Sequence, residues 1–326
     1  MSRRGVADRM KERELAMTLR SVVKTVTWAV GSCVLFVALQ GCSRDHIEAI
    51  NLANEGDRQV KVNVEGAISK YEQATQLDPT NHRILKKLSN AYEKKEDWDK
   101  MASTLARAVQ VAPEHADYWF KRGYALIQQA ENGNPDAYEA AKEPLKKCIE
   151  KDPNLAECYH FLGHASLWTD NVQDAVTNLS KAIEHDPTIA YFYPPLGETY
   201  VVLKLYDEAE KVLKEGTRIV QPTEKSAPNL YAMNLLLFQV AQARDDKPAM
   251  VAAMEHANEV AGDSHPEMKF NLGSTYAVMD PPRTEAAVRL LQTFTKRACR
   301  GEAASKFREQ CETAQSLIQK LAGTVN

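Results

Sequence analysis

Two histidines with helical spacing are the residues of this chain best placed to do chemistry. His160-Phe161-Leu162-Gly163-His164 puts two imidazoles one turn apart on a helix, a spacing that can hold a metal ion. The zinc-protease motif needs a glutamate as general base, and Phe161 stands in its place. A structural zinc site needs four ligands, and no nearby cysteine or carboxylate has the required spacing. The sequence therefore favours ligand contact over metal binding at His160 and His164.

Other catalytic signatures are missing from the sequence. Neither a GxSxG nucleophile turn nor a phosphate-binding glycine loop occurs, and glycine is scarce at 14 of 326 residues. We therefore predict that the protein is not an enzyme and uses no cofactor and no metal. The alternative that stays open is a protein that binds a ligand or a metal through His160 and His164.

Charge and composition exclude several classes of protein. The 41 Lys and Arg residues nearly balance the 44 Asp and Glu residues, which disfavours nucleic acid as a partner. Apolar residues make up 44% of the chain, which excludes collagen-like and low-complexity disordered proteins. Because Gly and Pro are few and no alternating strand pattern occurs, we predict an all-α protein.

The N-terminal segment has the pattern of a targeting signal. The apolar run from Val26 to Leu39 follows basic residues and is too short for the ~20 residues of a membrane-spanning helix. Leu39-Gln40-Gly41-Cys42 comes next and resembles the bacterial lipobox, which implies cleavage after residue 41 and a lipid on Cys42. An uncleaved signal anchor with Cys42 as an ordinary thiol stays open, as does a start at Met17. Both interpretations export the remainder of the chain.

The predicted mature chain is acidic. Without residues 1–41 it holds 34 Lys and Arg against 41 Asp and Glu, a net charge of −7. Anionic lipid surfaces repel such a body, so membrane attachment is expected through the lipid alone. Ser43 after the cysteine favours an outer-membrane lipoprotein facing the periplasm over an inner-membrane one.

Internal repeats dominate the rest of the chain. Prolines recur 34, 40, 34 and 35 residues apart, at Pro79, Pro113, Pro153, Pro187 and Pro222. Before each proline comes a small residue or Met, then a bulky residue four positions later, then a small residue three positions after that; the bulky ones are Tyr71, Leu105, Leu145, Leu179 and Leu213. This period and signature resemble the second helix of the tetratricopeptide repeat (TPR).

The first helix of each repeat carries its own signature. Trp119 and Gly123, Leu162 and Gly163, and Leu196 and Gly197 fall on the large-Leu-Gly-Tyr positions of the family, although Arg122 takes the usual Leu position before Gly123. The resemblance implies a TPR α-solenoid, a right-handed superhelix of helix-turn-helix repeats with a concave groove and a C-terminal capping helix.

The resemblance also divides the chain. It implies a signal peptide over 1–41, a lipidated N-terminus and first repeat over 42–79, four well-matched repeats over 80–222, two diverged repeats over 223–300, and a capping helix with a tail over 301–326. Six extra residues, 131–136, lengthen one inter-helix turn, since they include Gly and Pro. We expect a single amphipathic segment from Ala303 to Leu321 to cover the last repeat.

The predicted groove is charged at its N-terminal end and aromatic in the middle. Family groove positions fall on Arg83, Lys86, Asn90, Phe120, Tyr124, Ile127, His160, His164, Tyr191 and Glu198. Aromatic clusters are common anchors of peptide recognition. The carboxylate clamp of chaperone-binding TPR proteins is not matched, because Lys121 replaces a required Asn, so an acidic C-terminal tail is not the expected ligand.

Cysteine pairing is left open by the sequence. Cys148 and Cys158 lie five residues on either side of Pro153, where two antiparallel helices meet, so a disulfide and two free buried thiols are both reasonable. Cys299 and Cys311 are less symmetric, and a bond there is less expected.

The sequence as a whole resembles TPR lipoproteins of the cell envelope. Secretin pilotins, β-barrel assembly lipoproteins and gliding-motility components have this layout, and the TPR lipoproteins of the myxobacterial adventurous gliding machinery are similar to it. The resemblance implies a lipid-anchored scaffold or assembly factor that holds a polypeptide partner of an envelope-spanning machine in its groove. The alternative is a periplasmic ligand- or metal-binding protein that uses His160 and His164.

Overall fold

The computed structural model describes residues 44–322, and these form helices and turns without a β-strand. The predicted signal peptide and Cys42 lie outside the described residues. None of the described helices is both long and apolar enough to cross a membrane. The described chain divides into two compact parts, one ending at Lys121 and the other beginning at Arg122.

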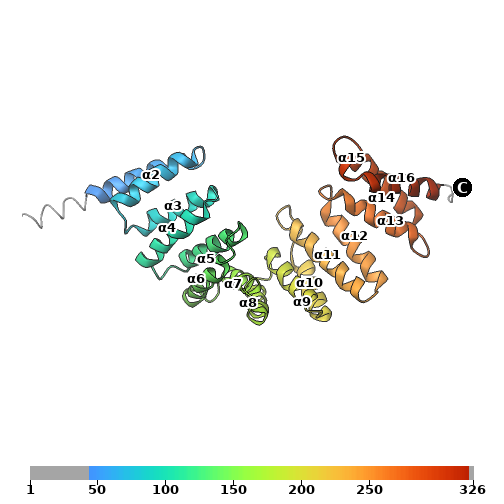
Figure 1. Cartoon of the computed structure of the whole chain (residues 1–326), viewed down its shortest axis with the longest axis horizontal. Coiled ribbons are helices and arrows are strands. Elements are labelled where there is room, and N and C mark those ends of the chain that lie inside the picture. The colour runs from blue at the N-terminus through green and yellow to red at the C-terminus, as the bar shows by residue number, and fades with distance from the viewer. Residues whose placement is uncertain (1–43, 323–326) are drawn as a thin grey trace, which may run out of the picture. The chain divides into compact units, whose positions relative to one another are not determined.

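The first part consists of antiparallel helices that follow one another along the chain (Figure 1). It contains a helix through residues 44–59, α2 (Val64–Leu77), α3 (His82–Lys94), α4 (Trp98–Val111) and the beginning of α5 (Ala116–Glu131). An Asn or Asp side chain caps three of these helices at Asn63, Asn81 and Asp97, each accepting a hydrogen bond from a backbone N–H three residues later.

The second part continues the same helix pairs (Figure 1). It contains α6 (Ala137–Lys151), α7 (Ala156–Leu167), α8 (Val172–His185), the 3-10 helix η1 (Ala190–Phe192), α9 (Tyr193–Val202), α10 (Tyr206–Ile219), α11 (Ala227–Ala243), α12 (Lys247–Ala261), α13 (Pro266–Val278), α14 (Thr284–Ala298), α15 (Ala303–Lys306) and α16 (Arg308–Ala322).

The repeat signature identified in the sequence is the core of each helix pair. The bulky residues of the second helices are at most 2% exposed, and the alanines at the small positions are fully buried. On the first helices, glycine provides the space for these bulky side chains. A Cβ atom at Gly197 would lie 2.5 Å from Leu213 Cδ2, closer than two carbon atoms can approach. The prediction of a TPR fold is confirmed by this packing.

Four of the turns between paired helices share one geometry. Glu96, Asp170, Lys204 and Asp245 each have a positive φ of 53° to 59°. The residue after each of them donates its backbone N–H to the carbonyl five residues earlier, as Leu205 does to Tyr200 at 2.8 Å. This is the Schellman ending of a helix, in which glycine usually occupies the left-handed position.

The C-terminal cap differs from the single helix expected over Ala303–Leu321. The helix is interrupted at Phe307, which separates α15 from α16. The Phe307 side chain is buried and its ring lies 5.9 Å from that of Phe294, so burial of this aromatic side chain outweighs helix continuity. Helix α16 then buries Cys311, Ala314 and Leu321 and covers the last repeat.

Two disulfides are present in the second part. One joins Cys148 on α6 to Cys158 on α7, with Cα atoms 6.2 Å apart. The other joins Cys299, at the end of α14, to Cys311 on α16. Each bond therefore ties together two helices that are already packed against each other.

Candidate partner-binding face

The charged residues at the N-terminal end of the predicted groove bind one another. Lys86 pairs with Asp117 at 2.6 Å, and this hydrogen bond raises the pKa of Lys86. Lys121 donates to Asn90 Oδ1 at 2.9 Å and to Glu93 Oε2 at 2.8 Å. These pairs connect α3 with the start of α5 and compensate the charges within the first part.

The other two predicted groove residues of the first part differ in exposure. Arg83 is exposed at the start of α3, whereas Phe120 is half-buried on α5. The structure places both of them in the first part.

A continuous cluster of rings forms in the second part, where three first helices follow one another. The Tyr124 ring of α5 lies 5.2 Å from that of Phe161, edge to face. His160, the neighbour of Phe161 on α7, contacts the Tyr191 ring of η1 at 5.0 Å, again edge to face. We call the side chains of Tyr124, His160, Phe161, His164 and Tyr191 the aromatic face.

Two prolines explain why Tyr191 lies on a separate short helix. Pro194 and Pro195 occupy the first turn of α9, where a missing backbone N–H costs nothing. Tyr191 therefore precedes α9 on η1, where its ring contacts both His160 and Phe192. Glu198, one turn further along α9, is exposed.

His160 is a buried polar group without a partner. Its side chain is 5% exposed, and its Nδ1 atom makes no hydrogen bond with any described residue. Burial, assisted by the neighbouring His164, lowers the pKa of His160 to about 3. The imidazole is therefore neutral near neutral pH, and an unmet hydrogen-bonding atom remains within the aromatic face.

His164 is more accessible than His160. Its Nδ1 atom is also without a hydrogen bond to a described residue, and its Nε2 atom lies 3.9 Å from Glu131 Oε1. Burial lowers the pKa of His164 despite the opposing charge of Glu131. The ring also contacts Tyr138, which stacks on the exposed Trp168 at 5.3 Å.

Ile127 differs from the expectation that it lines the groove. Its side chain is 0% exposed, so it belongs to the core and not to an accessible surface. Burial of an Ile side chain contributes about 1.5–3 kcal/mol, which favours the inward position whenever the helix register allows it. The assignment from helix register alone was wrong for the exposure of this residue.

The described residues offer little support for a metal at the two histidines. No group of three or more His, Cys, Asp or Glu side chains in residues 44–322 is arranged to hold an ion. His160 and His164 would therefore supply two ligands only, and no observation favours the ligand- or metal-binding alternative over partner binding.

The sequence analysis missed an apolar cavity between α10 and α12. It has a volume of about 840 Å³, and its floor is formed by α11 residues such as Leu230, Leu237 and Val240. Half of the α12 residues that line it are alanines, namely Ala249, Ala252 and Ala253, whose small side chains leave space. A run of alanines on one helix face was the signal in the sequence.

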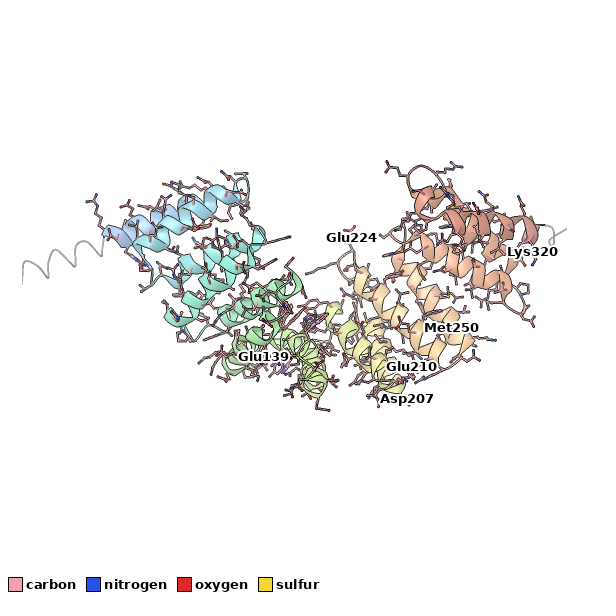
Figure 2. The ribbon with its side chains drawn as sticks, viewed as in Figure 1. Glu139, Asp207, Glu210, Glu224, Met250 and Lys320 are labelled. Carbon is pink, nitrogen blue, oxygen red and sulfur yellow. A yellow bond between two sulfur atoms is a disulfide. The ribbon has the colours of Figure 1, made fainter. Side chains whose placement is uncertain are left out.

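Ion pairs connect two of the helices that line this cavity. Arg244 binds both Asp207 and Glu210, and thus links the end of α11 to α10. Figure 2 shows Asp207 and Glu210 close together and Glu224 far from them; Glu210 and Glu224 both line the cavity. The charged groups of the rim include both signs and do not indicate one class of ligand.

Helix pairs with this signature and this glycine-leucine packing define a TPR solenoid. Solved structures with a similar fold include the C-terminal part of a TPR repeat-containing protein from Cytophaga hutchinsonii, which is 15% identical with a TM-score of 0.57 and covers 78% of this chain and 98% of that one. PilF of Pseudomonas aeruginosa is 14% identical with a TM-score of 0.51, covering 66% of this chain and 93% of its own.

A third similar structure is PilW, described as a widely conserved type IV pilus biogenesis factor. It is 16% identical with a TM-score of 0.51, and the match covers 69% of this chain and 97% of PilW. No protein-family model and no curated protein matches the chain. At these identities the likeness establishes the fold.

Proposed function

We propose that this protein is a non-enzymatic scaffold that binds a polypeptide partner on its aromatic face. The observation that carries the proposal is His160, a buried imidazole with an unmet Nδ1 atom among the rings of Phe161 and Tyr191. Aromatic side chains supply large contact areas, and hot spots of protein interfaces are enriched in them. A partner segment lying on this face would cover the half-buried rings.

The proposed setting is the cell envelope. The segment before Cys42 supports a lipid anchor, and Ser43 supports an outer-membrane location facing the periplasm. The partner would then belong to an envelope-spanning machine for gliding motility, for pilus or secretin assembly, or for outer-membrane assembly. The fold that this chain shares with the pilus biogenesis factor PilW supports that class of machine without selecting one member.

Photocrosslinking in the native cell tests the proposal directly. Benzoylphenylalanine at position 191 should form an adduct with a polypeptide, whereas the same group at exposed Gln173 on α8 should not. For a partner identified in this way, Tyr124→Ala should weaken binding about thirtyfold, the equivalent of ~2 kcal/mol at a hot spot.

The matched control is Gln173→Ala, which should leave affinity and melting temperature unchanged. If the Tyr124→Ala, His164→Ala double variant binds the crosslinked partner as tightly as the wild type, the aromatic face is not the binding site.

A further inference from the structure

The aromatic face is bordered by carboxylates that lack cationic partners. Glu157 on α7 is half-buried, Glu198 on α9 is exposed, and neither pairs with a lysine or arginine among the described residues. Glu131, on α5, has only the neutral ring of His164 and the amide of Gln128 near its carboxylate. Helices α5, α7 and α9 therefore each contribute one of these acidic groups.

Charge complementarity is different in the two parts of the chain. In the first part, Lys86 and Lys121 are each paired with a carboxylate. In the second part, the groove positions of α5, α7, η1 and α9 hold no lysine or arginine. The aromatic face is consequently bordered by carboxylates, which favours a ligand of opposite charge.

The two histidines do not compensate this charge near neutral pH. Burial lowers the pKa of His160 to about 3 and also lowers the pKa of His164, so both imidazoles are neutral there. They can offer a hydrogen-bonding nitrogen without repelling a cation.

Tyr191 joins the apolar and acidic elements of the face. Burial, followed by the charges of Glu157 and Asp186, raises the pKa of Tyr191 to about 12. The ring therefore lies within electrostatic reach of two carboxylates. A lysine or arginine side chain over a tyrosine ring gains a cation–π interaction, and here it would gain the attraction of the carboxylates as well.

We propose that the polypeptide segment bound on this face is basic. This inference rests on the proposed function and specifies the chemistry of the partner: an apolar side chain packs among Phe161, His160 and Tyr191, while flanking lysine or arginine side chains pair with Glu131, Glu157 and Glu198. An acidic segment would be repelled by the same carboxylates.

Selection from a random library of displayed 12-residue peptides tests this inference on the full-length chain in detergent. Peptides that depend on Tyr191, judged by their loss from a Tyr191→Ala selection, should be enriched in lysine and arginine over the input library. The individual peptides should bind several-fold more weakly when the salt concentration rises from 50 to 500 mM, roughly from a 14 Å to a 4 Å Debye length.

Carboxylate variants provide the matched comparison. The triple variant Glu131→Gln, Glu157→Gln, Glu198→Gln should bind these peptides roughly fivefold to tenfold more weakly, which is the combined effect of three surface charge pairs. The control Glu143→Gln, Glu184→Gln, Glu208→Gln changes the net charge equally at three exposed sites on second helices, and it should leave affinity within twofold.

The outcomes separate the two proposals. The basic-segment inference would be overturned if the Tyr191-dependent peptides were uncharged or acidic. It would also be overturned if they bound the carboxylate triple variant as tightly as the wild type. Either result would leave the proposed function standing. If every selected peptide bound the Tyr191→Ala protein as tightly as the wild type, so that none depended on the aromatic face, both the basic-segment inference and the proposed function would be overturned.

Discussion

Gly163 on α7 lies directly against Leu179 on α8. A Cβ atom at position 163 would be 2.7 Å from Leu179 Cγ and 3.1 Å from the backbone oxygen of Ala175. The glycine belongs to the signature of the first helix and the leucine to the signature of the second helix. The two signatures therefore describe the two sides of the same contact. The same relationship joins Gly123 to Leu145 and Gly197 to Leu213.

This contact predicts that Gly163→Ala destabilises the protein. The added methyl group has to displace Leu179 and the backbone of α8, an overpacking cost of about 1–3 kcal/mol that exceeds the ~1 kcal/mol gained in helix propensity. Thermal unfolding followed by circular dichroism should show a lower melting temperature. Gln173→Ala, exposed on α8, is the control and should change stability by less than ~0.5 kcal/mol. An unchanged melting temperature for Gly163→Ala would contradict the packing described for this pair.

A substitution at Lys204 should stabilise the protein, in contrast to Gly163→Ala. It has a φ of 59° in the turn between α9 and α10, a backbone conformation that costs a residue with a Cβ atom roughly 1–2 kcal/mol. Lys204→Gly removes this cost and should stabilise the protein by about 0.5–1 kcal/mol after the entropy loss of glycine is included. Lys204→Ala removes the same side chain but keeps the strain, so it should not stabilise. Equal melting temperatures for the two variants would show that backbone strain is not the cause.

Protonation of His160 should make stability depend on pH. Its pKa is about 3 in the folded protein against 6.5 for the unperturbed side chain. Below pH 6.5 the unfolded chain therefore binds a proton that the folded chain does not, and stability falls as pH is lowered, by up to about 1.4 kcal/mol per pH unit. His160→Gln should reduce the loss of stability between pH 7 and pH 5. Parallel stability curves for wild type and variant over this range would exclude a buried neutral His160.

Loss of the Cys148–Cys158 disulfide should weaken the second part locally. Its partners are 10 residues apart, and closing such a short loop contributes roughly 2–3 kcal/mol in the chain-entropy model. Because repeats are stabilised mainly by their neighbours, the Cys148→Ala, Cys158→Ala variant should exchange amide hydrogens faster in α6 and α7 than in α3 and α4. Peptide mapping without reductant should recover the two cysteines linked in protein purified from its native cell, and two free thiols would exclude the bond.

Lipidation of Cys42 is the prediction on which the proposed location depends. Cys42→Ala should abolish incorporation of a labelled fatty acid and leave either a soluble protein or an unprocessed precursor. Ser43→Ala, the neighbouring substitution, should retain the label. Equal labelling of wild type and Cys42→Ala would remove the lipoprotein proposal, and recovery of the wild type in the inner membrane alone would overturn the outer-membrane location.

Residues whose role is repeated along the chain were the most predictable ones. Leu145, Leu179 and Leu213 recur at one position of a repeat, so the period indicated both their helices and their burial. Ile127 has no such support: helix register placed it in the groove, but the local packing that buries it depends on neighbours that a single position does not reveal. Phe307 interrupts the expected cap for a similar reason, because its gain from burial against Phe294 is a tertiary effect.

The sequence predicted which residues form the candidate site better than it predicted which side chains pair with one another. The sequence placed Tyr124, His160 and Tyr191 on first helices, and the structure brings these rings together. It gave no sign that Lys86 and Lys121 would be paired internally, since partners on different helices are decided by side-chain reach. The cavity between α10 and α12 was missed because it forms partly where small alanine side chains leave space between helices.

The Cys299–Cys311 bond makes the two ends of the repeat array unequal. The last repeat of an array has a neighbour on one side only, so terminal repeats fray first. Here a covalent link holds α16 to the end of α14, and the final helix cannot detach while that bond is intact. The helix through residues 44–59 has no such link, because the described cysteines all lie beyond residue 147. The N-terminal helices should therefore unfold locally before the C-terminal ones, and a protease acting on the native protein would begin its digestion there.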